Sequence, residues 1–179
     1  ESNPSTFYAA LASGGLWKTE NNGITFKSIF DNVGPISIGE VAVDQNNPEI
    51  IWVGSGEANN SRTAYYGDGV YKSVDGGITF KHMGLSESHH VGRILIHPDN
   101  SEIVWVAAEG HLYSENRERG VYKTTDGGKS WKKVLEVKDH GKYIGAIDLT
   151  LDSSNPDIIY AAMYDKVRRP WTFNAGGPG

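Results

Sequence analysis

The sequence predicts an all-β fold made of repeated four-stranded antiparallel units, on three observations. A ten-residue segment recurs three times, a second segment recurs in phase with it, and short strand patterns alternate with turn residues between them. The chain of 179 residues carries 22 glycines, which is typical of a turn-rich β protein. Its 38% hydrophobic content is enough for a buried core, and no helical periodicity is present.

The first recurring segment begins at residues 17, 71 and 122 and aligns without gaps. Its hydroxyl positions, Thr19, Ser73 and Thr124, are separated by 54 and 51 residues. A second segment, Asn-Pro or Asn-Ser before an apolar run, begins at residues 3, 47, 100 and 155. Two markers that keep one period indicate structural repeats, and four strands in about 50 residues are the blade pattern of a β-propeller.

The elements follow in order within each repeat. In the second repeat we expect strands at 38–44, 49–54, 69–74 and 79–83, from the innermost outward. The sequence thus predicts a partial propeller of about three and a half blades, at about 3–31, about 36–85 and about 89–137, with an incomplete fourth blade from about 143. The first blade lacks its innermost strand and the fourth its outer two, so we expect further blades or a partner chain at the open ends.

Each ten-residue segment contains the pattern Ser/Thr-x-Asp-x-Gly-x-Thr/Ser-aromatic, known as the Asp-box. The Asp carboxylate and the Ser or Thr hydroxyl accept hydrogen bonds from turn N–H groups, and Gly supplies positive φ. This chemistry favours a structural role, with the aromatic residue packed between sheets. The predicted structural residues are Thr19, Asn21 (in place of Asp), Gly23 and Phe26; Ser73, Asp75, Gly77 and Phe80; and Thr124, Asp126, Gly128 and Trp131.

With these segments, the whole sequence resembles bacterial members of the sortilin-like Asp-box (BNR repeat) family, which are often labelled glycosyl hydrolases. The resemblance implies a long β-propeller that is exported, and therefore periplasmic or extracellular. Many members of this kind have no demonstrated catalysis.

Composition excludes several other functions. The formal net charge of −5 and the scattered Lys and Arg residues argue against a nucleic-acid partner. The apolar runs are too short for a membrane span, so we expect no direct membrane insertion. No cofactor is predicted, because the Gly54 and Gly56 pair lacks the third glycine of a dinucleotide fingerprint. No metal is predicted either, because the spacing of His89, His90, His97 and His111 matches no standard zinc site.

Topology restricts where a ligand would bind. Antiparallel strands place the Asn-Pro turns and the Asp-box turns on one face, and the loops between strands two and three, with the blade connections, on the opposite face. Those loops are short at 12–14 but long at 55–68, 109–119 and from 164 onward, which is typical of a binding face. Their aromatic, carboxylate and Arg side chains suit a glycan or a protein. The predicted ligand-binding residues are Asn59, Arg62, Tyr65, Tyr66, His89, His90, Arg93, His111, Arg117, Arg168 and Trp171.

Glu57 and Glu109 are the candidate catalytic residues. They follow Trp52 and Trp105 by five and four positions, so we expect both to point toward the same open face. Glycosidases hold two carboxylates roughly 5–5.5 Å or 6.5–9.5 Å apart. The Thr-Asp-x-Gly-Gly segment of xyloglucanase-type Asp-box propellers is replaced here by Gly-Ser-Gly-Glu at 54–57, and no pattern identifies the Arg triad and Tyr nucleophile of a sialidase.

Three functions remain open at this point. The first is a non-catalytic binding or scaffolding propeller that presents its loop-rich face to a protein or glycan. The second is a glycoside hydrolase that acts on a polysaccharide with paired carboxylates. The third is an accessory or assembly subunit of a membrane complex, by analogy of fold alone.

Overall fold

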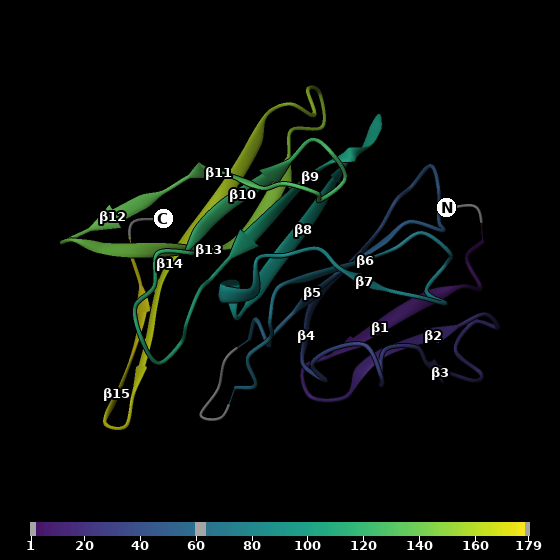
Figure 1. Cartoon of the computed structure of the whole chain (residues 1–179), viewed down its shortest axis with the longest axis horizontal. Coiled ribbons are helices and arrows are strands. Elements are labelled where there is room, and N and C mark those ends of the chain that lie inside the picture. The colour runs from purple at the N-terminus through teal and green to yellow at the C-terminus, as the bar shows by residue number, and fades with distance from the viewer. Residues whose placement is uncertain (1–2, 60–63, 178–179) are drawn as a thin grey trace.

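The computed structural model describes residues 3–59 and 64–177 and confirms the predicted all-β class. Four antiparallel sheets follow one another along the chain as the blades of a partial β-propeller (Figure 1). Arg62, one of the predicted ligand-binding residues, lies outside the described residues. No helix within the described ranges is long and apolar enough to span a bilayer.

The first three sheets are each built from consecutive strands of one repeat. The first contains β1 (Phe7–Leu11), β2 (Gly15–Thr19) and β3 (Lys27–Ser28). The second contains β4 (Ile38–Val43), β5 (Ile51–Ser55), β6 (Val70–Ser73) and β7 (Lys81–His82). The third contains β8 (Val91–His97), β9 (Asn100–Ala108), β10 (Gly120–Thr124) and β11 (Lys132–Leu135), and it is preceded by the 3-10 helix η1 (Ser86–Ser88). The four strands expected in the second repeat are therefore confirmed as β4 to β7.

The fourth sheet differs from the expectation at its outer edge. It contains β12 (Val137–Asp139), β13 (Lys142–Leu151), β14 (Ile159–Arg169) and β15 (Thr172–Gly176), in that order. The loop expected from residue 164 onward is wrong, because β14 continues to its end at residue 169 and pairs with β15. Met163 and Val167 explain the continued strand, since both are buried hydrophobic side chains on it.

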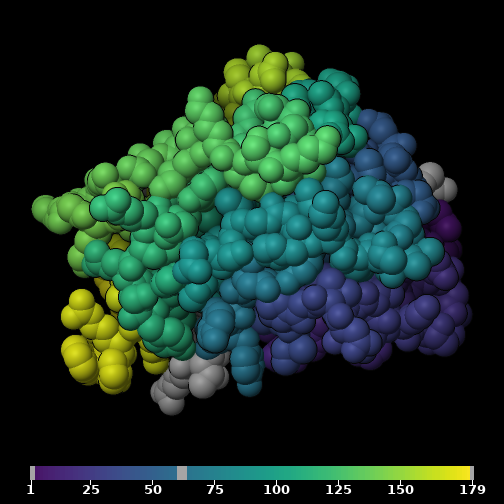
Figure 2. Space-filling model, viewed as in Figure 1, coloured from purple at the N-terminus to yellow at the C-terminus, as the bar shows by residue number. Residues whose placement is uncertain are grey.

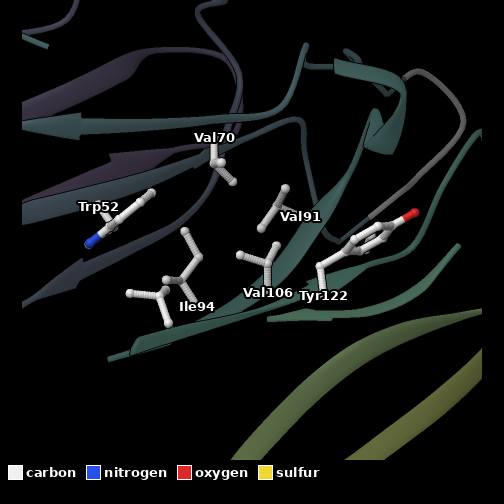
Figure 3. Packing of buried hydrophobic residues seen from close by; sticks show 8 residues of the cluster. Trp52, Val70, Val91, Ile94, Val106 and Tyr122 are labelled. Atoms are coloured by element: carbon white, nitrogen blue, oxygen red, sulfur yellow. The ribbon is translucent and has the colours of Figure 1, made fainter. Parts of the chain in front are cut away.

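Three apolar clusters fill the spaces between neighbouring sheets. Figure 3 shows the middle one, in which Trp52 and Val70 of the second sheet face Val91, Val106 and other side chains of the third. The other two clusters centre on Leu16, Phe30 and Ile51, and on Trp105, Ile144 and Leu149. Each fully buried side chain of this size contributes about 1.5–3 kcal/mol relative to exposure, so the sheets adhere mainly through these clusters.

The strand β8 approaches both β4 and β13 closely. A Cβ atom at Gly39 would lie 2.3 Å from the carbonyl oxygen of Val91, and one at Gly92 would lie 2.1 Å from that of Ile147. Only glycine allows this backbone approach. Arg93 on β8 then joins all three strands, because its guanidinium contacts Glu40 on β4 at 3.3 Å and Asp148 on β13 at 2.7 Å.

The recurring turns, at 19–26, 73–80 and 124–131, have the hydrogen bonds expected from the sequence. Ser73 Oγ accepts from Gly77 N at 2.9 Å, and Asp75 accepts from Thr79 N at 2.9 Å and from Thr79 Oγ1 at 2.5 Å. These donors, with the Ser73 hydroxyl, lower the pKa of Asp75 to about 2. The third turn repeats the network around Asp126, whose pKa is also lowered.

Asn21 preserves the same turn, but the hydrogen bond between its side chain and the Thr25 hydroxyl has the opposite direction. Its Oδ1 accepts from Thr25 N at 2.9 Å, while its Nδ2 donates to Thr25 Oγ1 at 2.8 Å. The aromatic residue that follows the turn packs between sheets for Phe80, against Phe30, and for Trp131, against Trp52. Phe26 instead packs on Phe7 of its own sheet and is 43% exposed.

Candidate functional site

The two opposite faces of the partial propeller carry the turns and the long loops as predicted. On one face the recurring turns lie beside the Asn-Pro turns, since Gly76 N donates to Glu49 O and Gly127 N donates to Glu102 O, both at 3.0 Å. The long loops meet on the other face, which we call the loop face. It comprises the described parts of the β5–β6 loop (56–59 and 64–69), the connection through η1, the β9–β10 loop and the β14–β15 hairpin, which projects at the lower left in yellow (Figure 2).

Backbone hydrogen bonds join the segments of the loop face to one another. Gly67 N donates to His89 O at 2.7 Å, and Glu109 N donates to His90 O at 2.9 Å. Arg168 N donates to Leu112 O at 2.8 Å, which attaches the third loop to β14. Segments from three sheets therefore form one platform.

A buried ion pair lies beneath this platform. Lys166 Nζ contacts Glu109 Oε2 at 2.8 Å and donates to Ala58 O at 2.8 Å, and the two charged side chains are only 5% and 2% exposed. Burial raises the pKa of Glu109 to about 7, against the opposite effect of Lys166. Glu109 Oε1 is buried without a hydrogen-bond partner among the described residues. Lys166 of β14 thus connects the fourth sheet to the segments that follow β5 and β9 in the second and third sheets.

Glu109 therefore does not point to the open face, contrary to the expectation for both carboxylates. The spacing after Trp105 located it correctly at the end of β9, but the neighbouring sheet covers its side chain. Glu57 is half-buried at the loop face, where its backbone N–H donates to Tyr65 O at 3.1 Å. Of the two candidates, Glu57 is thus the less buried.

Arg119 fixes the β9–β10 loop from the inside. It is 1% exposed, and its Nη2 donates to His111 O at 2.6 Å and to Lys166 O at 3.1 Å. Asn116 supports the same loop, because its Oδ1 accepts from His111 N at 2.9 Å and its Nδ2 donates to Glu87 O at 2.9 Å.

Three rings are stacked on the loop face. His89 lies between Tyr66, at a centroid distance of 5.0 Å, and His111, at 3.6 Å. His111 Nε2 contacts Glu87 Oε2 at 3.2 Å, and its Nδ1 contacts Ser114 Oγ at 3.0 Å. Burial and the neighbouring His111 lower the pKa of His89, so the imidazole in the middle of the stack is neutral at pH 7.

The other predicted ligand-binding residues divide into exposed and covered groups. His90 is 1% exposed, its Nδ1 contacts Glu57 O at 2.9 Å, and burial lowers its pKa to about 4. Arg93 belongs to the ion-pair network of β4, β8 and β13, and Arg168 lies 5.3 Å from the ring centroid of Phe173. The exposed members are Asn59, Tyr65, Tyr66, Arg117 and Trp171.

A cleft of about 550 Å³ lies elsewhere, between the first two sheets. It is lined by Phe7, Tyr8, Lys18, Val41 and Glu49 among others, and it includes none of the predicted site residues. Its residues belong to β1, β2, β4 and the turns opposite the loop face.

Sequence reasoning missed Lys166, Asn116 and Ser114. Lys166 falls in the expected loop, because the apolar run that includes Ile159 ends at Tyr164; Val167 is the one apolar residue between Lys166 and the end of β14. Ser114 contacts His111 of its own loop, and Asn116 contacts both that loop and Glu87 of η1, and the sequence carries no periodic signal for such loop contacts.

Comparison with known proteins defines the class as a β-propeller similar to GH74 enzymes. No family model and no curated protein matches the chain. Among solved structures, an ancestral GH74 enzyme has a TM-score of 0.71 at 20% identity, over 92% of this chain and 21% of that one. The GH74 enzyme of Niastella koreensis has a TM-score of 0.66 at 24% identity, over 89% and 23%.

A third similar structure is the GH74 xyloglucanase from Xanthomonas campestris, with a TM-score of 0.63 at 17% identity, over 90% of this chain and 26% of that one. The chain thus spans about a quarter of the length of each of these enzymes. At such identities the likeness shows the fold, and the sortilin-like resemblance stays a prediction.

Proposed function

We propose that the chain is part of a glycoside hydrolase that acts on a polysaccharide, and that its loop face binds the glycan. The observation that carries the proposal is the ring stack, which holds Tyr66 by packing against His89 while the residue stays 65% exposed. A fixed aromatic ring with an accessible apolar face suits the C–H face of a sugar. The shared fold with GH74 enzymes supports this choice.

Polar and aromatic groups around the stack fit the same ligand. Glu57 and Asn59 follow β5 on the loop face, and Tyr65 is 57% exposed. Trp171, at the turn of the β14–β15 hairpin, is 77% exposed. An extended chain of sugars can use several such rings in succession, with its hydroxyl groups bonded between them.

Glu57 is the candidate catalytic carboxylate in this proposal, and Glu109 is a positioning residue that acts through Lys166. Because Glu109 is 2% exposed, these two residues do not supply a pair of accessible carboxylates. The Asp-box pattern of the recurring turns supports placing the chain among Asp-box propellers. A polysaccharide substrate outside the cell is consistent with the export that the family resemblance implies.

The test measures retention of the chain on a panel of soluble polysaccharides by affinity electrophoresis. Tyr66→Ala should weaken binding about two- to tenfold, corresponding to about 0.5–1.5 kcal/mol for one stacked ring. Tyr160→Ala is the matched control, because Tyr160 is 58% exposed but contacts Asp152 of a turn on the opposite face. The absence of binding to every glycan in the panel would contradict the proposal.

Release of reducing sugar separates hydrolysis from binding. Release by the unmodified chain that Glu57→Gln abolishes would support the catalytic assignment. Binding without release would favour the non-catalytic propeller, and recovery of a stable protein partner without glycan binding would favour a scaffold.

A further inference from the structure

We propose that Glu87, His89 and His111 form a binding site for a divalent first-row transition metal ion, with Zn²⁺ as its simplest occupant. One ligand atom from each of the three side chains can be chosen so that all lie within 4.8 Å of one another. Two imidazoles and one carboxylate are a donor set that binds zinc and leaves positions open for water or a ligand hydroxyl. Metal binding is measured without a glycan, although turning His89 toward a metal ion also moves it relative to Tyr66, which stacks on it.

Two of the three ligands already have a suitable distance. His111 Nε2 and Glu87 Oε2 are 3.2 Å apart. Ligand atoms at 2.0–2.1 Å from a tetrahedral zinc ion are about 3.3 Å from each other. Coordination by these two groups therefore requires little movement.

His111 also has the outer contact that metal-bound imidazoles usually make. Its Nδ1 contacts Ser114 Oγ at 3.0 Å, on the side of the ring away from Glu87. When Nδ1 carries the proton, the lone pair of Nε2 faces the Glu87 carboxylate, and a cation between them stabilises that arrangement.

The backbone holds the three ligands in place. Asn116 joins two of them by accepting from His111 N and donating to Glu87 O, each at 2.9 Å. The carbonyl oxygen of His89 accepts from Gly67 N at 2.7 Å. Side-chain rotation is then sufficient to close the site: His89 leaves its stack on His111 and turns one ring nitrogen toward the other two ligands.

The test titrates the 179-residue chain, without a polyhistidine tag, with Zn²⁺ in competition with a chromophoric chelator. We expect one Zn²⁺ per chain, and at least about tenfold weaker binding for His111→Ala and for Glu87→Gln. His140→Ala is the matched control, because His140 is 93% exposed at a turn and contacts only the neighbouring Asp139 among the contacts observed for it. Mg²⁺, which prefers oxygen ligands, should not compete.

Each outcome decides the question. Zinc bound at one equivalent, weakened by both ligand variants and unchanged by His140→Ala, supports the site. No binding by the unmodified chain, or binding that survives His111→Ala, overturns it. Should His111→Ala fail to fold, Glu87→Gln decides alone, because Glu87 is 63% exposed and its replacement leaves no buried gap.

Discussion

The buried pair of Lys166 and Glu109 gives the sharpest stability prediction. In Lys166→Met the Glu109 carboxylate, 2% exposed and with Oε1 already unpartnered among the described residues, loses its 2.8 Å contact. Removing one partner of a buried ion pair costs about 3–5 kcal/mol. Protonation limits the loss, because burial already raises the pKa of Glu109 to about 7 and its carboxyl can become neutral at pH 7 with little further cost. We therefore expect a loss of about 1–3 kcal/mol, the cost of leaving buried acceptors without their donor.

Replacing both Lys166 and Glu109 separates the effect of charge pairing from that of side-chain packing. Glu109→Met should cost less than Lys166→Met, because Lys166 keeps its hydrogen bond to Ala58 O. Replacing both residues by methionine removes both charges and keeps apolar volume, so the free energy of unfolding should return to within about 1 kcal/mol of the original.

The assay is urea denaturation at pH 7 with the four variants of the double-mutant cycle, followed by fluorescence of the five tryptophans. A loss below about 1 kcal/mol in Lys166→Met would refute the reasoning. So would a double variant as unstable as the sum of the two single ones, because the two charges would then not interact.

Two further predictions concern the recurring turns and the glycines. The pKa of Asp75 is lowered from the usual 3.8 to about 2, so its ionised carboxylate stabilises the fold above about pH 4. This contribution is lost as the pH falls toward 2. Asp75→Asn should flatten the dependence of the urea midpoint on pH in that window, and an unchanged slope would contradict this. In calorimetric melts, Gly128→Ala should lower the free energy of unfolding by more than about 2 kcal/mol. Its Cβ would lie 2.5 Å from Trp52, and this packing clash adds to the strain of a positive φ. Gly141→Ala, with a similar positive φ and nothing within 4 Å, should cost only about 1 kcal/mol, and equal losses would be inconsistent with the packing explanation.

The repeats predicted the blades because a propeller blade is a local structure. The strands β4 to β7 and the turn around Asp75 depend on residues close in sequence, so periodicity and turn chemistry were enough to locate them. The extension of β14 was missed because the comparison with earlier repeats indicated a loop, whereas burial of Met163 and Val167 decides for a strand.

The candidate site was less accessible to sequence reasoning because long-range contacts determine it. The position of Glu109 after β9 does not reveal whether its side chain is exposed, since Lys166, 57 residues further along, covers and pairs with it. The stack of His89 and His111 likewise joins two loops whose approach depends on the packing of separate elements. The residue types that the sequence selected gather on one face, but their distances follow only from the fold.

The recurring turns also join neighbouring blades, which explains more of the repeat than turn formation does. Lys18 Nζ donates to the carbonyl oxygen of Gly76 in the next turn at 3.3 Å, and Lys72 Nζ donates to that of Gly127 at 3.4 Å. Lys72 Nζ in addition lies 3.6 Å from Glu102 Oε1, near the start of β9 in the next blade. The first two blades each contact the following one through the lysine that directly precedes the last residue of β2 or β6, which donates to a glycine in the next recurring turn. The Asp-box segments and the Asn-Pro or Asn-Ser segments recur with the same period because they meet at this contact between blades.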